Sequence, residues 1–197
     1  MANEQDRDDV RAAREAWLDA RPERDPERLI FIDETGLNTK MARLRGRCPK
    51  GARLRMSLPH GHRCSTTFVA GLRLDRLDAP VPIAGPRTGD AFPGHLRRVL
   101  VPTLRPGDVV SMDIPGGHES PTVREAIEAA AARSMVLPPC SPDFNPVAFA
   151  FARLETLLRA AAARSRDTPR ATVGRLLDAV TPAECRNLFT AAGYEPG

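Results

Sequence analysis

The chain has 197 residues, with 29 lysines and arginines against 25 aspartates and glutamates, a formal net charge of +4. That length suits one domain with a sizeable core, and 42% hydrophobic with 27% charged residues excludes a disordered or fibrous protein. No apolar run is long enough to cross a bilayer, and the polar N-terminus lacks a signal peptide's apolar stretch, so we expect a cytoplasmic protein without a membrane partner.

In chain order, the residue pattern predicts a helix, a group of strands, and then strands alternating with helices. We expect strands at 29–32, 53–58, 65–75, 80–83, 109–112 and 135–137, the fourth at a sheet edge because of its prolines. We expect helices at 9–20, 88–104, 120–133 and 147–163, and a helical tail at 168–193 broken near Thr181-Pro182. This order predicts an α/β fold with a mixed sheet flanked by helices and a helical C-terminal extension. We divide the chain into an N-terminal helix and linker (1–28) and one domain (29–197).

Two of the short apolar strands are followed directly by an aspartate, Asp33 after LIFI and Asp113 after VVSM. If these strands are parallel neighbours, their carboxylates meet at the carboxyl edge of the sheet, where sites in such folds lie. Paired carboxylates with hard oxygen ligands favour Mg²⁺ or Mn²⁺, and two metals suit phosphodiester chemistry. Aspartates that merely cap turns are the alternative.

Three segments carry a resemblance to a known family: FIDETG (31–36), MDxxGxH (112–118) and LPPCSPDFNP (137–146). Together they resemble the DDE transposases of the mariner superfamily, in its bacterial insertion-sequence branch. The resemblance implies a ribonuclease H-like endonuclease domain over 29–197, a two-metal Mg²⁺ or Mn²⁺ site, and DNA cleavage and joining at element ends. By the match, Asp33 and Asp113 are the first two catalytic, metal-binding carboxylates.

The third acidic position of the family falls on Ala148, whose methyl group cannot bind a metal. Asp143 and Glu155 are two candidate replacements, although Glu155 lies about 10 Å further along the expected helix. The chain also departs from the family pattern at Ile114, Pro115, Glu119 and Cys140. We therefore expect an impaired or inactive copy.

Residues 40–63 hold eight basic and no acidic residues, a charge of +8 against −4 for the remainder. We expect this basic stretch to contact DNA phosphates, with steep salt dependence; an ordinary solvated surface is the alternative. The expected nucleic-acid contacts are Arg43, Arg45, Arg47, Lys50, Arg53, Arg55, His60, His62 and Arg63, with His118 from the second motif. His60, His62 and Cys64 alternate and could begin a zinc site, although no fourth ligand is near in sequence.

These patterns favour the catalytic domain of a DNA transposase, impaired at Ala148. The alternative is a non-catalytic DNA-binding or dimerising remnant that regulates an intact transposase, and a metal-dependent nuclease without strand transfer is third. Some 30 residues before FIDE are too few for the family's helix-turn-helix region. We therefore expect a separately encoded helix-turn-helix half, or a chain that is a fragment, and leave homodimerisation open.

Overall fold

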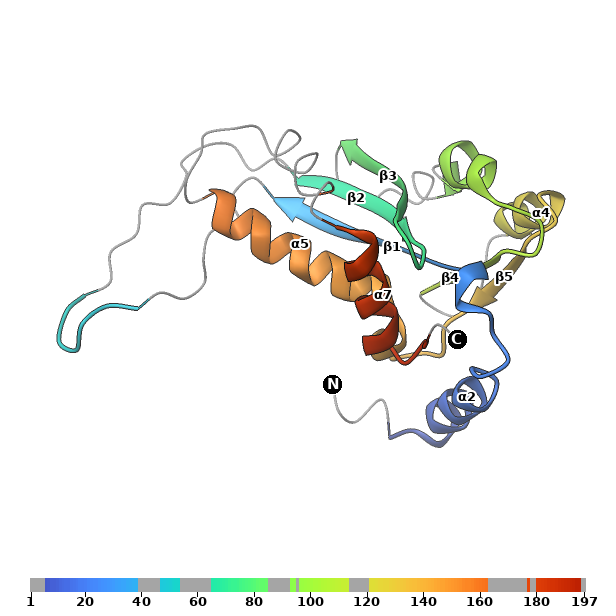
Figure 1. Cartoon of the computed structure of the whole chain (residues 1–197), viewed down its shortest axis with the longest axis horizontal. Helices are drawn as coiled ribbons and strands as arrows, with labels where there is room; N and C mark the ends of the chain where they lie inside the picture. Colours follow the sequence, from blue (N-terminus) through green and yellow to red (C-terminus); the bar gives the residue numbers. More distant parts are fainter. Residues whose placement is uncertain are drawn as a thin grey trace.

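The computed structural model describes residues 6–38, 47–53, 65–84, 93–94, 96–113, 121–162, 177 and 180–195 of the chain. Its centre is a mixed five-stranded sheet with helices packed on its faces (Figure 1). The helix α2 (Asp8–Asp19) precedes the sheet, and the short 3₁₀ turn Pro26–Arg28 leads into the first strand. None of the helices in this described part is both long and apolar enough to span a membrane.

The sheet has the strand order β3-β2-β1-β4-β5, which places the first strand at its centre. The strands are β1 (Leu29–Asn38), β2 (Ser65–Leu72), β3 (Leu77–Ala84), β4 (Val109–Met112) and β5 (Arg133–Val136). The first three strands form an antiparallel meander, whereas β4 runs parallel to both β1 and β5. The parallel pair β1–β4 therefore brings two strands of distant sequence to a common carboxyl edge.

Side chains alternate between two hydrophobic clusters along β1 and thereby define the two faces of the sheet. Phe31 points into a cluster shared with α5 (Pro146–Ala162) and α7 (Pro182–Ala191). Ile30 and Ile32 point into the opposite cluster, shared with α4 (Pro121–Ala129) and a π-helical turn at Leu96–Leu100. Figure 1 shows α5 lying along the sheet with α7 against it. Odd-numbered residues of β1 therefore face α5.

Most of the predicted elements are confirmed, with shifts at their ends. Residues 109–112 form β4 as predicted, and α5 and α2 differ from their predicted ranges by one residue at each end. The strand predicted at 80–83 is part of β3, at the sheet edge. The helix predicted at 88–104 was wrong in its described part, which forms the π-helical turn and a 3₁₀ turn at Val101–Thr103. The predicted strand over 53–58 falls almost entirely outside the described residues.

The first strand is longer than predicted. It continues through Asp33 to Asn38 because every residue from Phe31 onward has a partner on β2. Asp33 therefore lies within β1 and not beyond its end, while Asp113 does follow the last residue of β4. The backbone around Asp33 is held on both sides, because β4 pairs with β1 up to Ile32.

The two ends of the chain are joined by a buried tyrosine. The Trp17 Nε1–H of α2 donates to the Tyr194 hydroxyl at 3.0 Å, and that hydroxyl donates to the Phe144 carbonyl at 3.0 Å. Helix α7 itself begins with a reciprocal capping box between Thr181 and Glu184. The N-terminal helix and the C-terminal helix thus both brace the turn that leads into α5.

A buried charged group closes the opposite end of the sheet. Arg73, 3% exposed, donates to Asp78 at 2.5 Å and to Asp108 at 2.9 Å, and Arg105 N–H also donates to Asp108. Buried charges are tolerated when they are paired in this way. This group ties β2, β3 and the start of β4 together and is remote from the carboxyl edge.

Candidate catalytic site

The two aspartates singled out in the sequence are brought to neighbouring positions on adjacent parallel strands. The β1–β4 register aligns Ile32 with Met112, so Asp33 and Asp113 occupy the next position on each strand. Ile32 and Met112 both point into the cluster under α4. Asp33 and Asp113 therefore share the other face, the one covered by α5, at a strand spacing of about 5 Å. Asp33 is half-buried and Asp113 is exposed.

Both carboxylate oxygens of Asp33 accept hydrogen bonds. Oδ1 accepts from the Glu34 backbone N–H at 2.7 Å, and Oδ2 accepts from the Asn145 side-chain amide at 3.1 Å. Asn145 is only 1% exposed and directly precedes α5. Donors on both oxygens favour the ionised carboxylate and fix its orientation.

The third acidic position lies in the first turn of α5 beside this pair. Ala148 N–H donates to the Asn145 carbonyl, so the residue that holds Asp33 also begins the turn that carries Ala148. Ala148 is half-buried, at the border of the packed face of α5. Its side chain has no atom that can bind a metal.

Glu155 follows seven residues later on the same stripe of α5, and its carboxylate is already engaged. Oε1 accepts from the Thr35 hydroxyl at 2.9 Å, and Oε2 accepts from Arg159 at 3.0 Å. Thr35 lies two residues beyond Asp33 on the same face of β1, a displacement of about 7 Å. In this arrangement Glu155 closes the end of the site and does not join the aspartate pair.

Asp143 lies on the other side of Asn145 and is bound by the N-terminal helix. Arg14 donates to its two oxygens at 2.9 and 2.6 Å and also reaches the Ser141 hydroxyl. The hydrogen bond from Arg14 holds the pKa of the Asp143 carboxyl below its usual value. Asp143 therefore anchors α2 to the turn before α5.

The donor set fits one divalent cation better than two. Asp33 and Asp113 offer carboxylate oxygens, and the buried Asn145 Oδ1 has no hydrogen-bond partner among the described residues. Amide and carboxylate oxygens are the ligands that Mg²⁺ and Mn²⁺ prefer. Among those described residues, no cluster of three His, Cys, Asp or Glu side chains is placed to hold a metal. The gap corresponds to Ala148.

The expected DNA-contacting residues are only partly covered by the structure. Arg47, Lys50 and Arg53 are exposed. Their companions Arg43, Arg45, Arg55, His60, His62, Arg63 and His118 lie outside the described residues, as does Cys64. Their role in binding DNA stays a prediction.

Two polar residues of the site were not predicted from the sequence. Asn145 reaches Asp33 across 112 residues, and Thr35 reaches Glu155 across 120. The signal for the first was present, because an asparagine before a proline-initiated helix has its side chain free to bond outside the helix. What it bonds to depends on the packing of α5 over β1.

The fold and the aspartate pair define an endonuclease of the ribonuclease H-like class. Residues 28–169 match the model of the DDE superfamily endonucleases, and the chain belongs to that family. No protein of curated function matches the sequence.

The solved structures with the same fold are those of Mos1 mariner transposase. The paired-end complex with Mg superposes with a TM-score of 0.70 at 14% identity, covering 95% of this chain and 58% of that chain. The strand transfer complex gives 0.68 at 16% identity, covering 95% and 57%. The isolated catalytic domain gives 0.58 at 14% identity, covering 95% and 86%. The chain thus has the fold of a transposase catalytic domain and spans less than two thirds of the Mos1 chains in the two complexes.

Proposed function

We propose that this chain is the catalytic domain of a DNA transposase of the bacterial insertion-sequence branch, impaired in metal-dependent cleavage and strand transfer because its third acidic position is Ala148. The observation that carries this proposal is the β1–β4 register, which sets Asp33 and Asp113 side by side on the face that α5 covers. The arrangement suits phosphodiester chemistry, and the missing carboxylate limits it.

In this proposal Asp33 and Asp113 hold a divalent cation, Mg²⁺ or Mn²⁺. When bound, such a cation activates a water and neutralises charge that develops on the phosphate. Asn145 keeps the Asp33 carboxylate ionised and oriented, and its free Oδ1 offers a neutral oxygen where the family supplies a charged one. A site with two carboxylates has one negative charge fewer to hold a second cation. We therefore expect weak metal binding and slow cleavage.

DNA is the proposed partner, and the basic stretch over residues 40–63 is its proposed contact surface. Arg47, Lys50 and Arg53 are exposed there. Recognition of element ends belongs, in this proposal, to a separately encoded helix-turn-helix half. A remnant that binds DNA without cleaving it is the second candidate, and Ala148 is the observation that favours it.

A cleavage assay separates the two candidates. Purified wild type, Asp33→Ala, Ala148→Glu and Ala148→Glu/Asp33→Ala are incubated with element-end DNA and Mn²⁺. We expect little or no cleavage by wild type, clear cleavage by Ala148→Glu, and none by either Asp33→Ala protein. Robust wild-type cleavage that Asp33→Ala removes would refute impairment, whereas no cleavage by Ala148→Glu would favour the regulatory remnant.

A further inference from the structure

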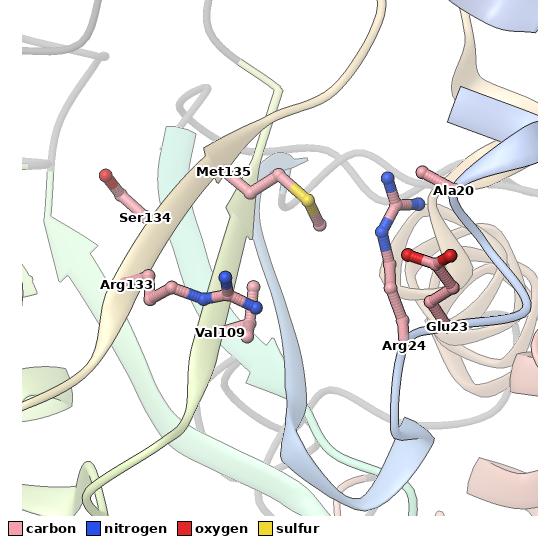
Figure 2. Close-up of a pocket in the computed structure, with 7 residues that line it drawn as sticks. All are labelled: Ala20, Glu23, Arg24, Val109, Arg133, Ser134 and Met135. Atoms are coloured by element: carbon pink, nitrogen blue, oxygen red, sulfur yellow. The ribbon is translucent and has the colours of Figure 1, made fainter. Parts of the chain in front are cut away.

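A pocket of about 350 Å³ opens at the start of β4 and β5, beside the segment that links α2 to β1. Figure 2 shows side chains from these three elements around it. Val109, Met135 and Ala20 give it an apolar lining, and Arg24 and Arg133 add two guanidinium groups. In this view the guanidinium groups of Arg24 and Arg133 lie on opposite sides of the pocket with Met135 between them.

The arginines of this pocket have no carboxylate partner. Arg24 stacks on Trp17, with its guanidinium carbon 4.0 Å from the ring centroid, and donates to the Trp17 carbonyl at 3.3 Å. Arg133 is exposed. Within the described residues no ion pair is formed by Arg24, Arg133 or the neighbouring Arg21, although Glu23 also lines the pocket.

The electrostatic consequence is an unneutralised positive cluster. Burial lowers the pKa of Arg24, and the charges of Arg21 and Arg133 lower it further. Arg24 nevertheless keeps its charge, because a guanidinium does not lose its proton in proteins. An anion between Arg24 and Arg133 would relieve this repulsion. The planar guanidinium forks suit the paired oxygens of a phosphate.

The pocket lies on the same sheet face as the aspartate pair. Val109 points into the cluster under α5, and Asp113 stands four residues further along the same strand with the same orientation. The separation is about 13 Å along β4, and successive phosphates of one DNA strand rise about 3.4 Å along the helix axis. A phosphate in the pocket would thus be about four nucleotides from one held at the aspartates.

We propose that the Arg24–Arg133 pocket binds a backbone phosphate of the DNA whose neighbouring phosphate, about four nucleotides away, lies at Asp33 and Asp113. The apolar lining at Val109 and Met135 accommodates the sugar attached to that phosphate. This inference rests on the proposed function, because it takes the aspartate pair as the place where DNA is cut. It adds a contact surface separate from the basic stretch over residues 40–63.

The test measures DNA binding without metal. A fluorescent duplex is titrated, in EDTA and at several salt concentrations, with wild type, Arg24→Gln/Arg133→Gln and the control Arg97→Gln/Arg98→Gln. The control pair is exposed on the turn under the opposite face. We expect the pocket variant to bind at least about tenfold more weakly and its slope of log K against log salt to become shallower by about 2. An unchanged slope, or an equal change in the control, would overturn the proposal.

Two further arms keep the outcome decisive. Arg133→Gln alone changes an exposed side chain, so it reports on DNA even if loss of Arg24 from Trp17 disturbs folding, and we expect about half the change in slope. Inorganic phosphate is added to wild type in a thermal shift experiment. Stabilisation of wild type but not of the pocket variant, with DNA binding unaltered, would assign the pocket to a small phosphorylated molecule and overturn the DNA proposal. Since the assay contains no metal, DNA binding through the pocket without cleavage refutes only the proposed function.

Discussion

Asn145 donates its side-chain amide to the carboxylate of Asp33 across 112 residues of sequence, at 3.1 Å. This bond joins the end of the 3₁₀ turn before α5 to the middle of β1. Because Asn145 is 1% exposed, its amide has no room to seek water instead. The bond therefore fixes where the first aspartate of the pair points.

Replacement of Asn145 by alanine is expected to weaken metal binding at the aspartate pair. The Asp33 carboxylate loses its donor, and groups that orient metal ligands typically contribute 10- to 100-fold in affinity. Mn²⁺ affinity is measured by isothermal titration for wild type, Asn145→Ala and the control Asn187→Ala, whose side chain is exposed on α7. Equal affinities for all three would show that Asn145 has no part in the site.

Replacement of Glu155 by glutamine is expected to leave Mn²⁺ affinity within about twofold of wild type. Its carboxylate bonds to Thr35 and Arg159, about 7 Å along β1 from Asp33. The amide of glutamine can still accept the Thr35 hydrogen bond. A tenfold loss of affinity in Glu155→Gln would mean that Glu155 moves in to replace the missing carboxylate.

Replacement of Tyr194 by phenylalanine is expected to lower the free energy of unfolding by about 1–3 kcal/mol, because the buried Trp17 N–H loses its acceptor. Burial raises the pKa of Tyr194 to about 12 from an ordinary value of 10.0. A raised pKa favours the neutral phenol in the fold, so this contribution is complete below pH 10 and is lost as the pH approaches 12. Denaturant titrations should show the two proteins converging over that range, and a constant difference would contradict the assignment.

Replacement of Arg73 by methionine is expected to cost about 3–5 kcal/mol of stability, because Asp78 and Asp108 stay buried without their partner. Arg76→Met is the matched control. Its side chain is 38% exposed and its close partner Asp75 is also exposed, so its loss should cost no more than about 1 kcal/mol. Similar losses for the two variants in urea unfolding would show that the buried pairing adds nothing.

Local patterns predicted the elements of this fold wherever burial dictates the sequence. VVSM is buried at every position, and this continuous apolar run marks β4 within its observed bounds. The second half of β1, DETGLN, is polar and reads as a turn, yet it forms a strand because β2 pairs with it. Pairing partners are distant in sequence, so a local pattern cannot reveal them.

The candidate site divides in the same way. Asp33 and Asp113 were found because each follows an apolar strand segment, and their pairing required only that β1 and β4 be parallel neighbours. Asn145, Arg24 and Arg133 act through side chains that packing brings together, and no spacing in the sequence encodes those meetings. The resemblance located the gap at Ala148, and the structure describes what surrounds it.

The central claim is that Asp33 and Asp113 form a cation site completed in related enzymes by an acid at the position of Ala148. Mn²⁺ affinity of wild type, Ala148→Gln, Ala148→Glu and Ala148→Glu/Asp33→Ala tests it without any need for activity. We predict that Ala148→Glu binds Mn²⁺ at least about tenfold more tightly than wild type, because an added carboxylate raises the ligand charge. Ala148→Gln should gain less, and loss of Asp33 should abolish the gain. Equal Mn²⁺ affinities for Ala148→Glu, Ala148→Gln and wild type would contradict the account.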